Sequence, residues 1–158
     1  MPKKTKILFI HHGTGIGGAP ISLLNLISEM DTKKKTSKVA MIKGVNAVEL
    51  FKNEDIETEV IQGNDNWFTH NETGKIQWKF LYRYPKIYID WKKTAKREAI
   101  EYLERQDADI VHLNSHVLSS WAYAARKSGF KVVLHNRETV AKGYTGFRHN
   151  ILKRLLRN

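Results

Sequence analysis

The sequence predicts an α/β protein: a Rossmann-like, doubly wound, mainly parallel sheet with helices on both faces. Short apolar runs alternate along the chain with segments of helical periodicity, as in repeated βαβ units. A glycine-rich turn follows the first apolar run, at the place where such folds approach their ligands. With 158 residues, 41% of them hydrophobic and 27% charged, the chain is long enough for one domain with a sizeable core.

The first half of the chain alternates strand and helix signals. Pro20 suits the first turn of a helix, and Ile21, Leu24 and Ile27 follow at helical spacing. Val45 opens a second, shorter helical segment. Apolar runs predict strands over residues 6–10, 39–42 and 58–62, and the polar segment 63–74 predicts a loop.

The second half repeats the alternation. Pro85 is expected to break the helical pattern, so that a longer helix runs from Asp90 to Gln106. Gly129 is expected to close the helix that starts at Ser115. Further apolar runs predict strands over 109–113 and 131–135, and a basic amphipathic pattern predicts a last helix over 147–157.

Parallel strands with right-handed crossovers end at one edge of the sheet, and ligands of such folds bind beyond that carboxyl edge. Three polar segments follow predicted strands: the glycine turn 11–20, Asn114–His116 and His135–Glu138. We therefore expect these segments to meet along one edge and to form the binding site.

The glycine turn allows three interpretations. Gly13, Gly15 and Gly18 satisfy the spacing G-x-G-x-x-G between a strand and a helix, where backbone N–H groups bind phosphates. A dinucleotide site would need an acidic residue near the end of the second strand, but Lys43 and Gly44 stand there. Proximity to a phosphate or diphosphate, a purely structural turn and an NAD(P) site all stay open.

The net charge of +11 is concentrated in two stretches. Residues 75–97 carry a net +7 and residues 142–158 a net +5, which leaves the remainder at −1. The first stretch is also rich in aromatic residues, a combination that fits an anionic membrane surface, a nucleic acid or a solvated face beside core aromatics. We expect an anionic membrane surface as a partner and no nucleic acid.

Several classes of protein are disfavoured. The chain has no cysteine, which excludes disulfides, thiolate metal sites and a cysteine nucleophile. No apolar run approaches the ~20 residues of a membrane span, and the run 7–10 is too short for a signal peptide. No two histidines have the spacing of a zinc site on one helix, so we expect no metal and no other cofactor. We expect a cytoplasmic protein, peripheral on the inner face of the membrane.

The motifs, taken in order, resemble a known family. The strand Ile7–Ile10, the loop Gly15–Ala19 and the leucine-rich helix at Leu23–Leu26 resemble the opening of glycosyltransferase family 4 enzymes. Asp109–Ser115 resembles the fourth strand of that family and its edge. His135–Glu138 resembles the His-x-Arg-Glu motif of polysaccharide-building members.

This resemblance implies the acceptor-side, N-terminal half of a GT-B glycosyltransferase. Such an enzyme transfers a sugar from a nucleotide-diphosphate sugar to a cell-surface polysaccharide or lipid-linked glycan. The other half, a C-terminal GT-B domain or partner subunit, would hold most of the nucleotide sugar, so the chain by itself is expected to be inactive. The alternative is a membrane-associating or NAD(P)-binding Rossmann module without transfer activity.

The sequence differs from the family at two places. Many relatives have Glu where this chain has Pro20, and many have a second histidine where Asn114 stands. His116, two residues further along, is the candidate for that histidine's role.

Candidate site residues fall into three groups. Asn114 and His116 are the predicted catalytic pair, although Asn114 also suits a helix N-cap. Ordinary structural roles are open for others: His12 as a cap of the turn, Arg137 in an ion pair with Glu138, and His112 as a satisfied core group. The predicted donor-diphosphate or acceptor contacts are Gly15, Gly17, Gly18, His12, Arg137 and Glu138. The predicted contacts with a membrane or lipid-linked acceptor are Trp78, Lys79, Arg83, Lys86, Trp91, Lys92 and Lys93.

Overall fold

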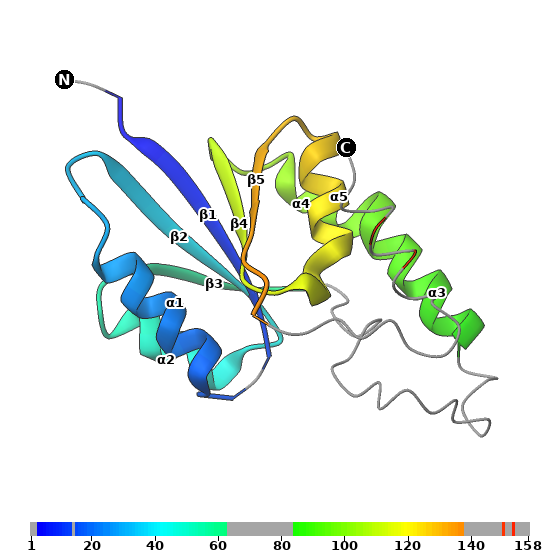
Figure 1. Cartoon of the computed structure of the whole chain (residues 1–158), viewed down its shortest axis with the longest axis horizontal. Helices are drawn as coiled ribbons and strands as arrows, with labels where there is room; N and C mark the ends of the chain where they lie inside the picture. The colour runs from blue at the N-terminus through cyan, green and yellow to red at the C-terminus, as the bar shows by residue number, and fades with distance from the viewer. Residues whose placement is uncertain (1–2, 14, 63–83, 138–149, 151–152, 154–158) are drawn as a thin grey trace.

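The computed structural model describes residues 3–13, 15–62, 84–137, 150 and 153 (Figure 1). Five parallel strands form one sheet in the order β3-β2-β1-β4-β5. The strands are β1 Thr5–His12, β2 Lys35–Ile42, β3 Glu57–Ile61, β4 Ile110–Leu113 and β5 Lys131–Leu134. The helices are α1 Gly18–Ser28, α2 Val45–Lys52, α3 Tyr84–Lys93, α4 Ala99–Leu103 and α5 Ser119–Lys127. A π-helical turn, η2 Thr94–Glu98, joins α3 to α4, and a 3-10 turn, η3 His116–Leu118, precedes α5.

The sheet is covered on both faces, because alternate side chains of each strand point to opposite sides. Leu8 and Ile10 of β1 belong to a core that contains Leu103 of α4 and Trp121 of α5. Phe9 of β1 belongs to a second core, with residues of α1 and α2. Figure 1 shows the two helix pairs on opposite sides of the strands. The predicted Rossmann-like, doubly wound sheet is therefore confirmed.

Pro85 begins a helix, although it was expected to break one. It lies at the second residue of α3, where no backbone N–H is needed and the fixed φ of proline suits the helix. The helical path starts at Tyr84, six residues before the predicted start at Asp90, and continues through η2 into α4. Figure 1 shows α3 running away from the sheet, beyond α4.

Two other helix predictions have different outcomes. The inner face of α1 consists of Pro20, Leu23 and Ile27, whereas Ile21 is 44% exposed. The predicted apolar stripe of α1 was therefore wrong in including Ile21. Gly129 closes α5 as predicted: its φ is +83°, and the Phe130 N–H donates to the carbonyl of Ala125 in a Schellman-type end. The predicted loop 63–74 and the predicted helix 147–157 lie outside the described residues, except Asn150 and Lys153.

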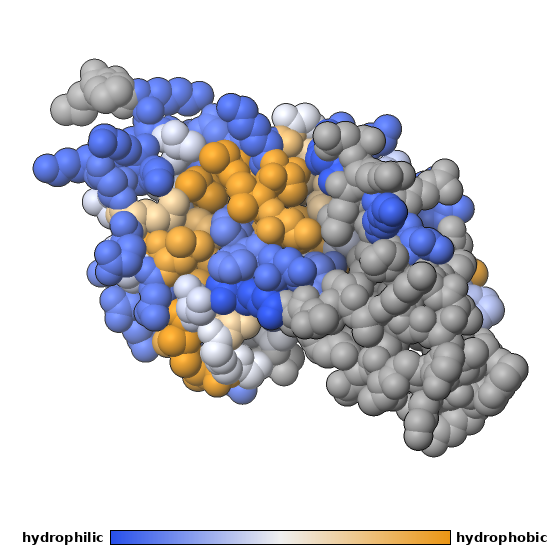
Figure 2. All heavy atoms as spheres, in the orientation of Figure 1, coloured by the Kyte–Doolittle hydropathy of each residue, from blue (hydrophilic) through white to orange (hydrophobic). Residues whose placement is uncertain are grey.

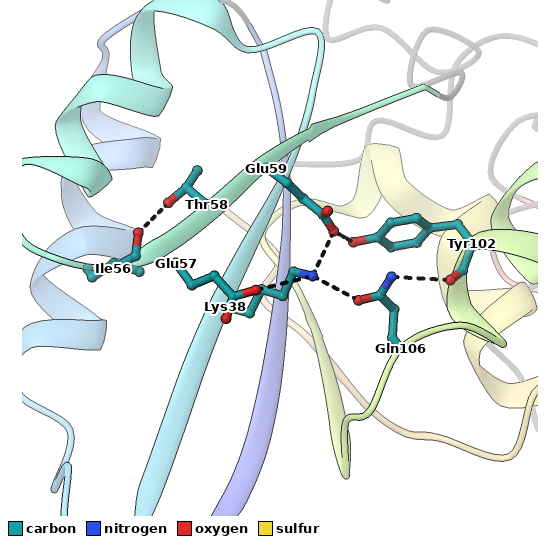
Figure 3. Close-up of polar contacts among 7 residues, drawn as sticks. All are labelled: Lys38, Ile56, Glu57, Thr58, Glu59, Tyr102 and Gln106. Atoms are coloured by element: carbon teal, nitrogen blue, oxygen red, sulfur yellow. Dashed lines mark hydrogen bonds and ion pairs between the residues drawn. The ribbon is translucent and has the colours of Figure 1, made fainter.

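On the α4 side of the sheet, Lys38 of β2 is the centre of a paired polar network (Figure 3). Its Nζ lies 3.3 Å from Glu57 Oε1, 3.1 Å from Glu59 Oε1 and 3.2 Å from Gln106 Oε1. The Tyr102 hydroxyl also donates to the Glu59 carboxylate. Partial burial acts to lower the pKa of Lys38, but the hydrogen bonds and charges of Glu59 and Glu57 raise it overall. This network ties α4 to β2 and β3.

Candidate functional site

Polar side chains replace apolar ones at the carboxyl edge of the sheet, on the face covered by α1. Phe9, His112 and Val133 occupy one row of the parallel register across β1, β4 and β5. Because side chains on one face recur every second residue, the next row consists of His11, Asn114 and His135. Figure 2 shows the result, with hydrophobic residues over β4 and β5 and a hydrophilic zone at their carboxyl ends. The edge therefore changes from core to polar site within two residues of each strand.

Asn114 is the centre of this polar group and is 1% exposed. Its amide nitrogen lies 3.0 Å from His11 Nδ1 and donates to the Ala19 carbonyl at 3.2 Å. Its amide oxygen accepts from Arg137 Nε at 2.9 Å. An arginine can only donate and a carbonyl can only accept, so these partners fix which way the amide points. Asn114 thereby joins β1, the first turn of α1 and the segment after β5.

Arg137 is half-buried and is held from three directions. Besides Asn114, it donates from Nη1 to Ser22 Oγ at 2.7 Å, and its Nη2 lies 3.4 Å from His135 Nδ1. None of these three partners is an acidic side chain. No carboxylate of the described residues pairs with this guanidinium; Glu138, the partner expected from the sequence, lies outside them.

His11 is held in one tautomer by the same geometry. Since the Asn114 amide nitrogen donates, His11 Nδ1 must accept, and the ring proton is on Nε2. The pKa of His11 is lowered to about 4 by its burial, and further by the nearby charges of His12 and Arg137. The ring is therefore a neutral hydrogen-bond donor at neutral pH.

His112 and His135 extend the polar row toward the middle of the face. The His112 ring lies 4.9 Å from the Phe9 ring and 5.9 Å from the His135 ring, centre to centre. Burial, His135 and Arg137 together lower the pKa of His112 to about 4. Its Nε2 is buried and makes no hydrogen bond, so the prediction of a satisfied core histidine was wrong. Within the described ranges, no three His, Cys, Asp or Glu side chains come together in a way that would hold a metal ion.

The glycine turn stands beside this cluster, between β1 and α1. Gly13 has φ +103°, a conformation that favours glycine. A Cβ on Gly44, in the next strand-to-helix turn, would lie 2.9 Å from the Gly13 carbonyl oxygen, so Gly44 permits the two turns to touch. By contrast, a Cβ on Gly15, Gly17 or Gly18 would meet open space. These last three glycines leave room for a ligand to approach the backbone.

The predicted catalytic pair is buried. His116 is 2% exposed, and its Nδ1 lies 3.2 Å from Asn136 Oδ1. Asn114 is not the N-cap that its position suggested; Ser115 is, because its hydroxyl accepts from the Val117 N–H at 3.1 Å. His12 is half-buried at the end of β1. The predicted convergence of the three segments on one edge is confirmed.

The predicted membrane contacts are described only in part. Trp78, Lys79 and Arg83 lie outside the described residues, as do the side chains of Lys86 and Trp91. Lys92 and Lys93 are exposed near the end of α3. Ile89, 62% exposed, is on the same helical face as Lys92. None of the helices that the structure describes is long and apolar enough to cross a membrane.

Sequence reasoning did not single out three members of the site: His11 and His135, which lie in segments expected to form it, and Ser22, which does not. The sequence held a signal for two of them. In the parallel register, His11 and His135 fall in the same row across the strands as Asn114, and on the same face of the sheet. Ser22 carried no such signal. It lies on α1, 115 positions before Arg137, and only the packing of the helix brings the two together.

Comparison with known proteins places the fold. No protein-family model matches the chain, and no curated protein matches it. Among solved structures, HepE from Anabaena in complex with UDP superposes on 96% of this chain with a TM-score of 0.61 and 16% identity. MurG from Acinetobacter baumannii superposes on 97% of it with a TM-score of 0.58 and 18% identity. Both neighbours are GT-B glycosyltransferases.

The chain spans only 35% of the length of HepE and 39% of the length of MurG. The same fold also occurs elsewhere: the C-terminal domain of a hydrogenase from Pyrococcus furiosus matches with a TM-score of 0.50, 16% identity, 85% of this chain and 92% of that one. At such identities the likeness concerns the fold alone. The chain therefore has the Rossmann-like fold that GT-B glycosyltransferases share with other α/β proteins.

Proposed function

We propose that this chain is the acceptor-side half of a GT-B glycosyltransferase, which transfers a sugar from a nucleotide-diphosphate sugar to a polysaccharide or lipid-linked glycan. The observation that carries the proposal is the carboxyl edge, where an open glycine turn stands beside a preorganised guanidinium. The likeness to HepE, whose structure contains UDP, supports the same assignment.

In this proposal the glycine turn approaches the donor diphosphate. Gly15, Gly17 and Gly18 leave their backbone accessible, and the N-terminus of α1 adds the positive end of a helix dipole. Negative charge accumulates on the diphosphate as it leaves, so N–H groups fixed before the reaction stabilise the transition state. His12, at the end of β1, is the nearest candidate for a side-chain contact with the same group.

The buried residues have supporting roles in the proposal. Asn114 holds Arg137 and His11 in place, and its burial makes it a positioning residue. His116, held near Asn136, supports the segment after β5 in the same way. Most of the nucleotide sugar would be bound by a second GT-B domain or partner subunit, in keeping with the third of HepE that this chain spans.

Titration of the chain with UDP, followed by NMR of its backbone amides, tests the proposal. We expect weak binding, with shifts confined to the glycine turn and the start of α1. Gly17 has φ −120°, which any residue adopts, so Gly17→Val would fill the open space without straining the backbone. This variant should lose the shifts, whereas the exposed control Lys35→Gln should keep them.

Two outcomes would contradict the proposal. Micromolar binding of UDP at one site would mean that the donor site is complete in this chain. UDP-induced shifts that are absent from the glycine turn, or that survive in Gly17→Val, would mean that the turn does not receive a diphosphate.

A second function, association with an anionic membrane, is supported by the surface of α3 and η2. Pro85, Ile89, Lys92 and Lys96 are exposed and share one helical face. An apolar residue beside lysines suits the interface of an anionic bilayer, where each lysine contributes about 1 kcal/mol.

Vesicle sedimentation tests this function. Changing both Lys92 and Lys96 to Gln should weaken binding to vesicles of phosphatidylglycerol by roughly 30-fold, which corresponds to two lysines. The double change Lys33→Gln with Lys35→Gln removes equal charge from two exposed positions, one in the turn before β2 and one at the start of β2, and should have little effect. Equal binding of the unmodified chain to neutral and anionic vesicles would refute the membrane function.

A further inference from the structure

Arg137 is a partly buried, permanent cation, and no acidic side chain within the described ranges compensates its charge. None of its three hydrogen-bond partners, Asn114, Ser22 and His135, is an acidic side chain. Removing a charge from water is unfavourable, so buried charges in proteins are normally paired with an opposite charge. The position of Arg137 therefore points to an anion that binds there.

The remaining donors of Arg137 suit an oxyanion. A guanidinium has five N–H donors, and three are used here, one on each nitrogen. One N–H remains on Nη1 and one on Nη2. Two donors on adjacent nitrogens match the two oxygens of a carboxylate or phosphate, which is the strongest geometry available to arginine.

The guanidinium is ordered before any ligand arrives. Asn114 fixes Nε, and Asn114 is itself fixed by His11 and the Ala19 carbonyl. Ser22 fixes Nη1 from the side of α1. A donor group that is already ordered loses little entropy when it binds, so this arrangement favours affinity and a defined orientation of the ligand.

This anion position differs from that of the glycine turn. Ser22 comes four residues after Gly18, which places it about 6 Å further along the axis of α1. Arg137 therefore lies against the flank of α1, whereas the turn presents its N–H groups at the tip. This edge therefore offers two places for negative charge.

We propose that Arg137 binds an oxyanion carried by the acceptor, so that the acceptor class is an acidic glycan or a phosphate-bearing lipid-linked sugar. That the ligand is an acceptor rests on the proposed function. That the ligand carries an oxyanion rests on the geometry of Arg137. The carboxylate of an acidic sugar and the phosphate of a lipid carrier present the same chemistry to the guanidinium.

NMR titration of the full chain with three probes tests the proposal: glucuronate, methyl phosphate and neutral glucose. We expect glucuronate or methyl phosphate to shift the backbone amides around Ser22 and Arg137, and glucose not to do so; the tighter of the two anions identifies the source. Arg137→Gln should weaken anion binding at least tenfold. Arg137→Lys keeps the positive charge but lacks the paired N–H donors of the guanidinium, so it should bind the anions with intermediate affinity. The control Lys35→Gln removes a positive charge at the opposite edge and should not change the affinity.

The outcomes are decisive in both directions. The proposal is overturned if Arg137→Gln and Arg137→Lys both bind the anions within twofold of the unmodified chain, if glucose shifts the same amides, or if UDP displaces the anion from Arg137. Failure of the proposed function is separate, because it appears as unshifted glycine-turn amides in the UDP titration while anion binding at Arg137 persists.

Discussion

Lys38 and Arg137 lie on opposite faces of the same sheet, and their partners differ in charge. Lys38 contacts two carboxylates and an amide, and its neighbours satisfy its charge completely (Figure 3). Arg137 is held by three hydrogen-bond partners, none of which is an acidic side chain. In our proposal, the first cation needs no ligand, whereas the second gains stability when an anion binds. The proposal thereby distinguishes a structural network from a binding site.

The same contrast extends along the strands. At the amino edge, Lys6 pairs with Asp107, and the Lys6 backbone N–H donates to Asp109 at 2.8 Å. At the carboxyl edge, the cation is accompanied by His11 and His112, both kept neutral by burial and nearby positive charge. Lys6 at the amino edge thus has an acidic partner, whereas Arg137 at the carboxyl edge has none among the described residues. This is the arrangement expected where parallel strands end at a ligand.

The largest effect is expected from Asn114, the residue on which the unpaired cation depends. Asn114→Leu would leave Arg137 Nε and His11 Nδ1 without their Asn114 partner and remove the hydrogen bond to the Ala19 carbonyl, at a cost of roughly 3–4 kcal/mol in the free energy of unfolding. Asn25→Leu, on the exposed side of α1, should change it by less than about 0.5 kcal/mol. Urea denaturation measures the free energy of unfolding of both variants. Similar costs would mean that the hydrogen bonds of Asn114 do not stabilise the fold more than an exposed position does.

Asn114→Asp sharpens the same comparison. A carboxylate at this position would pair with Arg137 and make the carboxyl edge resemble the Lys38 network. We expect the variant to lose binding of glucuronate and methyl phosphate, measured by NMR titration. Undiminished anion binding would show that the charge of Arg137 is not what attracts the anion.

The neutral histidines predict a pH dependence. The pKa of His11 is about 4 in the folded chain and 6.5 in the unfolded chain, so between these values the unfolded state takes up a proton that the folded state does not. The contribution of His11 to the free energy of unfolding should therefore be fully present above pH 6.5. It should fall by up to about 3 kcal/mol as the pH is lowered to 4. His112 adds a smaller part, because solvent screens it more. His11→Gln should flatten the curve between pH 6.5 and pH 4; an unchanged slope would refute this origin.

A smaller effect is expected from the paired cation. Lys38→Met would leave Glu57 and Glu59 facing each other without their shared partner, at a cost of about 1–2 kcal/mol. Thermal denaturation of the variant and of the unmodified chain measures this cost, and an unchanged free energy of unfolding would contradict it.

The smallest effect is expected from Tyr102. Tyr102→Phe removes the hydroxyl that donates to Glu59 and keeps the ring, which contacts the Trp121 ring edge-on at 5.8 Å between centres. The expected cost is about 1 kcal/mol in the free energy of unfolding. Anion binding at Arg137 should not change, because the network lies on the other face of the sheet. A change in that binding would mean that the two regions are coupled.

Much of the fold could be predicted from the sequence, because alternating patterns encode it directly. The apolar runs gave all five strands, and Gly129 gave the end of α5. Pro85 misled because one proline can either break a helix or start it, and the local pattern does not distinguish the two. Ile21 misled because α1 has more apolar residues than its buried face can accommodate.

The location of the site could be predicted from the sequence, but the contacts between its residues could not. That three segments would meet at the carboxyl edge followed from topology, but their pairing did not. Asn114 bonds His11 across 103 positions, and Arg137 bonds Ser22 across 115. Contacts at such separations depend on how α1 packs, and no local pattern records that.

The comparison between the two cations can be tested most directly by observing both side chains in one experiment. NMR of the arginine Nε–H and lysine Nζ groups, with glucuronate and methyl phosphate added to the full chain, reports each cation separately. We predict that the Arg137 Nε–H resonance shifts in a saturable way while the Lys38 Nζ resonance stays fixed. An Arg137 resonance that does not respond, or equal responses of the two cations, would contradict the claim that the carboxyl edge holds the binding site.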